Sequence, residues 1–231
     1  EAGLCSRREA DEWLLAGRVS INGEIVTTGA KALDGDEVRV DGEIVRMRVL
    51  APTAAAKKGV YIALNKPVGI TCTTDQNVAD NITDFVDHAQ RIFPIGRLDK
   101  DSEGLILLTS NGDIVNEILR AENHHEKEYL VAVNKAVTDE FIMGMAKGVH
   151  IHGQLTQRCR VRRIAKYGFS IVLTQGLNRQ IRLMAAAFGY RVTQLRRVRI
   201  DNVKLAHLKL GQWRNLTEAE LKGLLPGRTQ W

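Results

Sequence analysis

Apolar residues recur at two spacings near the start of the chain, one helical and one alternating. Helical spacing runs through "ADEWLLAG", directly after the Ser-x-x-Glu capping box of Ser6 and Glu9, and this predicts a short helix. Alternation follows in "RVSINGEIV" and "VRVDGEIV", where Asn-Gly and Asp-Gly favour tight hairpin turns. Residues 1–48 are therefore predicted to form a small unit of one helix and several short strands.

The pattern changes after this unit. Residues 49–59 contain small residues, a Pro and no periodicity, which is typical of a linker. Further on, apolar runs predict strands in "VYIALNKPVG", "GLILLT", "EKEYLVAV", "RCRVRRI" and "FSIVLT". Helical spacing predicts helices in "NGDIVNEILRA", "TDEFIMGMAKG", "NRQIRLMAAAFG" and "TEAELKGLLPG", and Asn178 and Gly189 are expected to cap the third of these. Residues 60–231 are therefore predicted to form one α+β domain.

Charge narrows the classes of partner. The chain has a net charge of +6 and a pI of about 9.3, which favours a polyanion and nucleic acid first. The longest aliphatic run, Leu105–Leu108, is far shorter than the ~20 residues of a membrane span, so no membrane partner is expected. The densest arginine patches lie at Arg7-Arg8, residues 158–163 and residues 191–199.

Cysteine and histidine spacing gives no sign of a metal or a disulfide. The three cysteines lack Cys-x-x-Cys spacing, which favours free thiols in a reducing compartment and so a cytoplasmic protein. No signal peptide is visible, and because the sequence does not begin with Met we expect it to start inside its gene product. The histidine pairs at positions 124 and 125 and at 150 and 152, the second expected on one strand face, lack further ligands at a convincing spacing.

The acidic segment "DKDSEG", residues 99–104, has the spacing with which a calcium-binding EF-hand loop begins. Such a loop needs Glu at its twelfth position, where this chain has Ser110, and the following "GLILLT" is β-like rather than helical. A glycosidase carboxylate pair of Asp99 with Asp101 or Glu103 is geometrically feasible, but aromatic residues are only 5% of the chain and none lies in this loop. Asp101 and Glu103 are therefore interpreted as residues of a solvated turn.

Asp99 has a different environment from its acidic neighbours. It follows Arg97 and Leu98 and precedes a strongly apolar strand. A carboxylate near a hydrophobic wall needs a cationic partner, or its pKa rises and it becomes neutral. A single ionised Asp in such a place is suited to attack at an anomeric carbon or addition to an electron-poor ring.

Four segments in order resemble the A-type pseudouridine synthases of the ribosomal small subunit. "GRLDKDSEGLILLT" resembles the catalytic segment, "ALNKPVGITCTT" the first segment, "EKEYLV" the tyrosine segment and "GLNRQIRLM" the last one. The amino-terminal "LCSRREADEWLLAGRVSINGEIV" resembles an S4 RNA-binding domain. Within the family, the segments are most similar to large-subunit synthases of the F type, with the B and E types next. The resemblance implies a small S4 domain followed by a core with a mixed, mainly antiparallel sheet flanked by helices.

The resemblance implies roles for particular residues. Asp99 is the catalytic residue, Tyr129 the aromatic ring under an extruded uridine, and Arg182 the cation that keeps Asp99 ionised. Arg97 is the alternative partner of Asp99, or else a contact to RNA phosphate or to a neighbouring loop. Leu183 stands where family members more often have Arg. The remaining expected contacts to substrate or RNA are Lys66, Pro67, Asn178, Arg179, Leu183, Arg7, Arg8, Arg18, Arg196 and Arg197.

The reaction implied by the resemblance is an isomerisation. The N1–C1′ bond of uridine breaks and C5 reattaches to the sugar, so no metal, nucleotide or flavin is required. Asp99 either attacks C1′, adds to C6 of the base or abstracts a sugar proton, and the sequence leaves all three open. The expected partner is ribosomal RNA, 23S by resemblance, with transfer RNA as a second candidate, bound by a monomer. The alternative is a non-catalytic S4-domain protein that binds ribosomal RNA.

Overall fold

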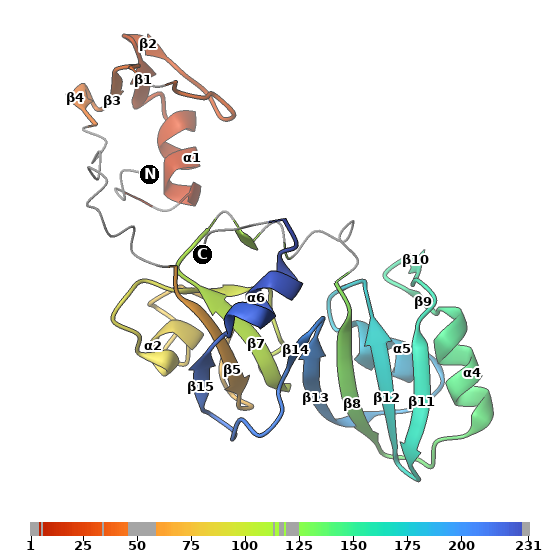
Figure 1. Ribbon diagram of the computed structural model, residues 1–231. Coiled ribbons are helices and arrows are strands. Elements are labelled where there is room, and N and C mark those ends of the chain that lie inside the picture. Colours follow the sequence, from red (N-terminus) through yellow and green to blue (C-terminus); the bar gives the residue numbers. More distant parts are fainter. Residues whose placement is uncertain are drawn as a thin grey trace. The chain divides into compact units, whose positions relative to one another are not determined.

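The computed structural model describes residues 5, 7–33, 35–45, 59–112, 114, 115, 118 and 125–227, without the side chains of Arg7 and Arg8. The chain divides into two compact units, Glu1–Lys57 and Lys58–Trp231 (Figure 1). The predicted capping residue Ser6 and most of the predicted linker lie outside the described residues. The domain limits at residues 48 and 60 stay a prediction.

The first unit contains the predicted helix and hairpins. Helix α1 (Arg7–Leu15) precedes a sheet with the strand order β2-β1-β3-β4. The first hairpin joins β1 (Val19–Ile21) to β2 (Glu24–Ile25), and the second joins β3 (Val38–Val40) to β4 (Glu43–Ile44). Both residues of each turn have positive φ, as a type I′ turn requires, so the Asn-Gly and Asp-Gly prediction is confirmed.

The second unit is built on a mixed sheet with the strand order β11-β12-β8-β13-β7-β5-β15 (Figure 1). β14 pairs antiparallel with the end of β13, and β6 pairs antiparallel with β7. Most neighbours are antiparallel, whereas β13 and β7 run parallel. The strands are β5 (Tyr61–Lys66), β6 (Phe93–Ile95), β7 (Glu103–Thr109), β8 (Lys127–Val133), β11 (Arg160–Ala165), β12 (Gly168–Leu173), β13 (Val192–Ile200), β14 (Val203–Lys204) and β15 (Trp213–Asn215). A separate hairpin pairs β9 (His150–Ile151) with β10 (Gln154–Leu155).

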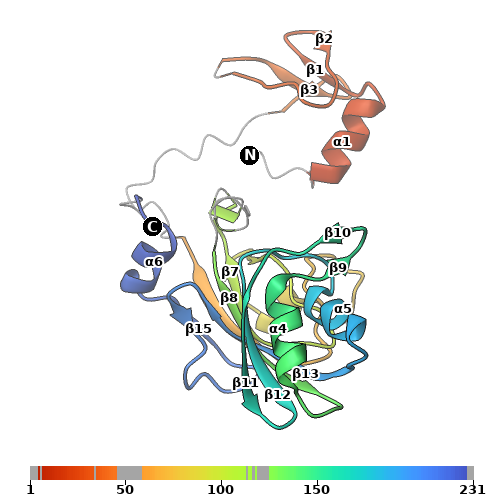
Figure 2. The ribbon, with the colours of Figure 1, turned by 90° about the vertical axis from the view of Figure 1, so that its right-hand side faces the viewer.

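The central strands β5 and β7 are buried on both faces, as the continuous apolar run of β7 predicts. Their alternate residues enter two apolar clusters on opposite faces. Helices α2 (Ile82–Val86), α4 (Asp139–Lys147) and α5 (Gln180–Ala187) contribute to one cluster. Helix α6 (Glu218–Leu224) lies on the other face and contributes to the second cluster (Figures 1 and 2). Thr217 caps α6 with a full capping box.

The parallel contact between β7 and β13 depends on Gly104. In this register Gly104 pairs with Arg197, and its φ of +106° lies in a region that favours glycine. A Cβ at this position would lie 2.2 Å from the backbone oxygen of Arg197. Glycine therefore lets the two backbones approach at the point where the halves of the sheet meet.

Three local predictions need correction. Helix α5 has Arg179 as its N-cap, in a left-handed conformation without a side-chain cap, so the expected cap at Asn178 is wrong. His152 has a φ of 50° and lies in the turn after β9, so it does not share a strand face with His150. The arginine-rich run 191–199 largely forms strand β13, which was not predicted. No described helix is long and apolar enough to cross a membrane.

Candidate active site

The loop between β6 and β7 contains Asp99 and is held from one side by neighbouring backbone and a thiol. The buried Cys72 Sγ donates to the Leu98 carbonyl at 3.2 Å and accepts from the Leu98 amide at 3.4 Å. Burial raises the pKa of the Cys72 thiol, which favours the protonated form that can donate. The Gly69 amide donates to the Lys100 carbonyl at 2.8 Å. The loop that follows β5 therefore fixes the backbone on both sides of Asp99.

Helix α5 holds the same loop from the other side. Arg182 donates to the Asp101 carbonyl at 2.9 Å and to the Ser102 hydroxyl at 3.0 Å. Arg182 also forms an ion pair with the Asp101 carboxylate at 3.4 Å, and its own side chain is only 13% exposed. Arg179 donates to both oxygens of that carboxylate, at 3.3 and 3.2 Å. Asp101 lies in a turn with its side chain 48% exposed, as expected, and it is also a shared acceptor for two arginines, which was not predicted.

The backbone of Asp99 is held by a hydrogen bond, whereas its carboxylate has no partner among the described residues. Its carbonyl accepts from the Ser102 amide at 3.0 Å, which closes a turn. Its residue is partly buried, and within the part of the chain that the structure describes no hydrogen bond or ion pair reaches its carboxylate. The predicted direct pair of Asp99 with Arg182 is thus not formed, because Asp101 and Ser102 take up that guanidinium. Arg97 is exposed and contributes a backbone carbonyl to the site.

Lys66 is buried beneath the loop rather than exposed to RNA. Its ammonium donates to the carbonyls of Pro67 and Ile70, each at 2.8 Å, so it closes the turn at the end of β5. Burial lowers the pKa of Lys66, and the charges of Asp101 and Asp99 act against that shift. A fully buried ammonium is not placed to contact phosphate in this conformation, and the role of Lys66 toward substrate or RNA stays a prediction. Pro67 is partly exposed.

Tyr129 lies on β8 directly opposite Arg197 of β13. The Arg197 guanidinium lies 6.0 Å from the centre of the Tyr129 ring. Arg197 also donates to the Leu105 carbonyl at 2.6 Å and to the Arg97 carbonyl at 3.5 Å, so it links β13 to the loop before β7. Lys127 lies two residues before Tyr129, and burial and the charge of Arg197 lower the pKa of Lys127 to about 8. Sequence reasoning missed Lys127.

The predicted arginine patch on β13 is divided between two faces of the sheet. Successive strand residues point to opposite faces, so Arg196 and Arg197 diverge. Arg197 is only 4% exposed, which rules out the expected RNA contact in this conformation. Arg199 forms ion pairs with Glu126 and Glu128. Arg196 is partly exposed, and no ion pair of Arg196 is found in the part of the chain that the structure describes.

The other expected RNA contacts differ in exposure and in their partners. Arg18 pairs with Asp41 in the first unit, with its Nε 2.8 Å from the carboxylate, and stacks on Trp13 at 5.1 Å. Leu183 is partly buried and packs against an apolar cluster, which gives it a packing role in α5. Asn178 is exposed. The roles of Arg7 and Arg8 at the start of α1 stay a prediction.

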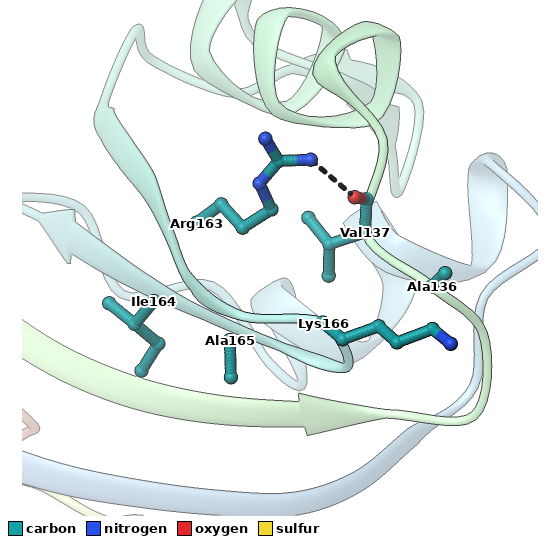
Figure 3. A pocket seen from close by; sticks show the side chains of 6 residues that line it. All are labelled: Ala136, Val137, Arg163, Ile164, Ala165 and Lys166. Atoms are coloured by element: carbon teal, nitrogen blue, oxygen red, sulfur yellow. Dashed lines mark hydrogen bonds between the residues drawn. The ribbon is translucent and has the colours of Figure 1, made fainter.

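A hollow on the surface lies away from this loop. It is lined by Ala136, Val137, Arg163, Ile164, Ala165 and Lys166, and Arg163 donates to the Val137 carbonyl at 3.2 Å (Figure 3). These residues surround the end of β11, which β12, β8 and β13 separate from β7 in the sheet. The hollow therefore has no part in the candidate site.

Comparison with known proteins gives matches along the chain. Residues 60–187 match the RNA pseudouridylate synthase family, and residues 1–38 match the S4 domain. The chain is 56% identical over 221 residues to the "Dual-specificity RNA pseudouridine synthase RluF" of Salmonella typhi, which covers 96% of this chain and 74% of that protein. It is 33% identical over 232 residues to the "Ribosomal large subunit pseudouridine synthase B" of Bacillus subtilis, covering 96% and 91%.

A solved structure matches nearly the whole chain. The protein described as "Crystal structure of pseudouridylate synthase" is 30% identical, with a TM-score of 0.70, and the match covers 95% of this chain and 94% of that one. The mixed sheet and the preceding S4 domain are therefore features that this chain shares with known enzymes.

Proposed function

This chain belongs to the RNA pseudouridine synthase family, and we propose that it converts a uridine of large-subunit (23S) ribosomal RNA to pseudouridine. The family reaction is an isomerisation of uridine within RNA. The names of the two relatives support the substrate, because one is a large-subunit synthase and the other has dual specificity. We propose transfer RNA as the second substrate. A ribosomal substrate fits a cytoplasmic monomer, which stays part of this proposal.

Asp99 is the proposed catalytic residue. The observation that carries this role is the contrast within its loop, where neighbouring backbone is held from two sides and the Asp99 carboxylate has no partner among the described residues. A fixed backbone with a free reactive group is what an attacking carboxylate needs, because productive geometry is then set before the substrate binds. The carboxylate starts the reaction at C1′, at C6 or at a sugar proton.

Tyr129 and Arg182 support Asp99 in different ways. Tyr129 offers an aromatic ring for an extruded uridine, and stacking of this kind contributes about 1–3 kcal/mol. Its hydroxyl is the proposed group for proton transfer at C5, since the C5 proton leaves and N1 gains one in the isomerisation. Arg182 acts through the loop, by binding the backbone and side chain after Asp99, rather than by direct pairing with its carboxylate.

RNA binding is proposed to involve the S4 domain and exposed arginines of the larger unit. The S4 match at residues 1–38 and the net charge of +6 support this proposal. Arg7, Arg8 and Arg196 are the proposed phosphate contacts. Arg18 has part of its charge neutralised by Asp41, so it is a weaker candidate.

The test compares two variants with the wild-type protein on unmodified 23S ribosomal RNA and on transfer RNA transcripts. Pseudouridine is mapped by carbodiimide labelling and primer extension, and RNA binding is measured separately. Asp99→Asn keeps the size of the side chain but removes its charge, so it should abolish pseudouridine formation while binding persists. Asp139→Asn is the matched control, because it removes a 76% exposed carboxylate that pairs with Arg163 at 3.4 Å.

The outcomes of this test distinguish a pseudouridine synthase from a non-catalytic RNA-binding protein. A wild-type protein that binds ribosomal RNA without forming pseudouridine would favour the non-catalytic S4-domain protein. Activity of Asp99→Asn within tenfold of wild type would contradict the proposed role of Asp99. Modification of ribosomal RNA but not of transfer RNA would refute the second substrate alone.

A further inference from the structure

Two arginines converge on one exposed carboxylate beside the proposed catalytic residue. The Asp101 side chain is 48% exposed, yet Arg179 binds both of its oxygens and Arg182 pairs with it as well. A single exposed ion pair contributes little to stability, so stability gives a weak account of this arrangement. Both arginines come from the start of α5, whereas Asp101 lies in the turn before β7. The contact therefore links two segments that the sequence separates widely.

The backbone of Arg179 supports a positional role for this contact. Arg179 has a φ of 50° and a ψ of 27°, a left-handed conformation that residues other than glycine rarely adopt. It also begins α5 without a side-chain cap. Strain of this kind persists where surrounding contacts fix the residue, and it gathers at functional sites. In the described structure the contact that the guanidinium of Arg179 makes is with Asp101.

We propose that Asp101 is a positioning residue, which locks the turn carrying Asp99 against α5 through Arg179 and Arg182. The path from Asp101 to Asp99 is short. Arg182 binds the Asp101 carbonyl and the Ser102 hydroxyl, and the Ser102 amide donates to the Asp99 carbonyl. The Asp101 carboxylate pairs with Arg182 and so orients the guanidinium that makes these two bonds, and it also ties the turn to Arg179. Its loss should therefore loosen the turn in which Asp99 lies. The inference rests on the proposed catalytic role of Asp99.

The negative charge of Asp101 distinguishes a positioning role from a role in RNA binding, because the two roles predict different effects of Asp101→Asn on affinity for RNA. Asp101→Asn removes a negative charge, frees Arg179 and takes one of its partners from Arg182, so affinity for RNA should stay the same or increase. The rate of reaction should nevertheless fall, because small displacements of a reacting group are costly. A slower reaction with undiminished binding is therefore the expected combination.

The experiment measures single-turnover pseudouridine formation with saturating protein on the unmodified 23S ribosomal RNA transcript, and the Kd for the same RNA by filter binding. Asp101→Asn should lower the rate at least tenfold with Kd unchanged or tighter. Asp101→Glu should recover part of the rate, because it keeps the charge. The control Asp139→Asn should match wild type in rate and Kd. Thermal unfolding is measured for each variant.

A second variant covers the case in which Asp101→Asn does not fold. Arg179→Gln alters a side chain that is 46% exposed, and it should slow the reaction to a similar extent. The double variant should be no slower than the slower single variant, since both changes break one contact. If the double variant is slower by the product of the two single reductions in rate, the inference is overturned. A wild-type rate in either single variant would overturn it as well. Weaker binding with a normal rate at saturation would overturn it too.

Asp99→Asn is measured in parallel so that two kinds of failure can be distinguished. An inactive Asp99→Asn beside a fully active Asp101→Asn would overturn this inference alone. An active Asp99→Asn would overturn the proposed catalytic role and with it the inference. An inactive Asp99→Asn and an Asp101→Asn slowed at least tenfold, both with RNA binding retained, is the result that the structure leads us to expect.

Discussion

Gly104→Ala should be among the most damaging single-methyl changes in the larger unit. The added Cβ would lie 2.2 Å from the backbone oxygen of Arg197 and 2.7 Å from its backbone nitrogen, and neither atom can rotate away. The strands must separate, which as overpacking costs about 1–3 kcal/mol. The φ of +106° adds a further strain of about 1–3 kcal/mol for a residue with a Cβ. We expect a loss of about 2–6 kcal/mol in the free energy of unfolding.

Alanine variants at two other glycines distinguish the cost of the backbone clash from the cost of the strained φ. Gly69 has a φ of +96° with nothing within 4 Å of an added Cβ, so Gly69→Ala should show the strain alone, about 1–3 kcal/mol. Gly176 has neither a positive φ nor a near neighbour, so Gly176→Ala should stay within about 0.5 kcal/mol of wild type. The difference in the free energy of unfolding between Gly104→Ala and Gly69→Ala then measures the cost of the backbone clash between β7 and β13.

Urea unfolding followed by fluorescence provides the assay. Trp13 lies in the first unit and Trp213 in β15, so a background with Trp13→Phe and Trp231→Phe reports unfolding of the larger unit through Trp213. Pseudouridine formation below the transition shows whether Gly104→Ala also displaces Asp99. A loss for Gly104→Ala no greater than that for Gly69→Ala would refute the reasoning from the backbone clash.

Two further predictions concern charge. The pKa of Lys127 is lowered to about 8 from 10.5, so the folded protein loses this proton before the unfolded chain does. Compared with Lys127→Met, the wild-type free energy of unfolding should therefore rise by about 2–3 kcal/mol between pH 8 and pH 10.5, and parallel pH curves would contradict this. Deletion of residues 1–48 should leave the larger unit folded, weaken RNA binding and reduce the log–log salt slope by about 0.7–0.9 for each lost phosphate contact. An unchanged slope would assign RNA binding to the larger unit.

Local features of the fold could be predicted from the sequence because their causes lie within a few residues. Asn22-Gly23 and Asp41-Gly42 have positive φ and form their hairpins, as these pairs favour. Thr217 caps α6 through hydrogen bonds to Glu220, three residues away. The preference for Asn at a helix N-cap failed at α5. Its N-cap is Arg179, which makes no side-chain cap hydrogen bond, rather than the expected Asn178. Contacts of Arg179 with a distant loop accompany that exception.

The sequence also predicted which segments form the candidate site, because each segment can be recognised from a short run of its own residues. The loop with Asp99, the strand with Tyr129 and the helix with Arg182 were each identified from their own neighbours. Their roles in catalysis stay predictions, since the comparisons match the family and do not test single residues.

Only the tertiary structure decided which charged groups meet. Arg197 and Arg196 are adjacent in sequence, yet one is buried against Tyr129 and the other faces the opposite side of the sheet. Arg182 meets Asp101 rather than Asp99, although both carboxylates lie some 80 residues away in the chain. Such pairings depend on strand register and on the close approach of β7 to β13, which no local pattern encodes. A charge pattern shows that arginines and carboxylates are present, whereas the sheet determines which of them lie within hydrogen-bonding distance.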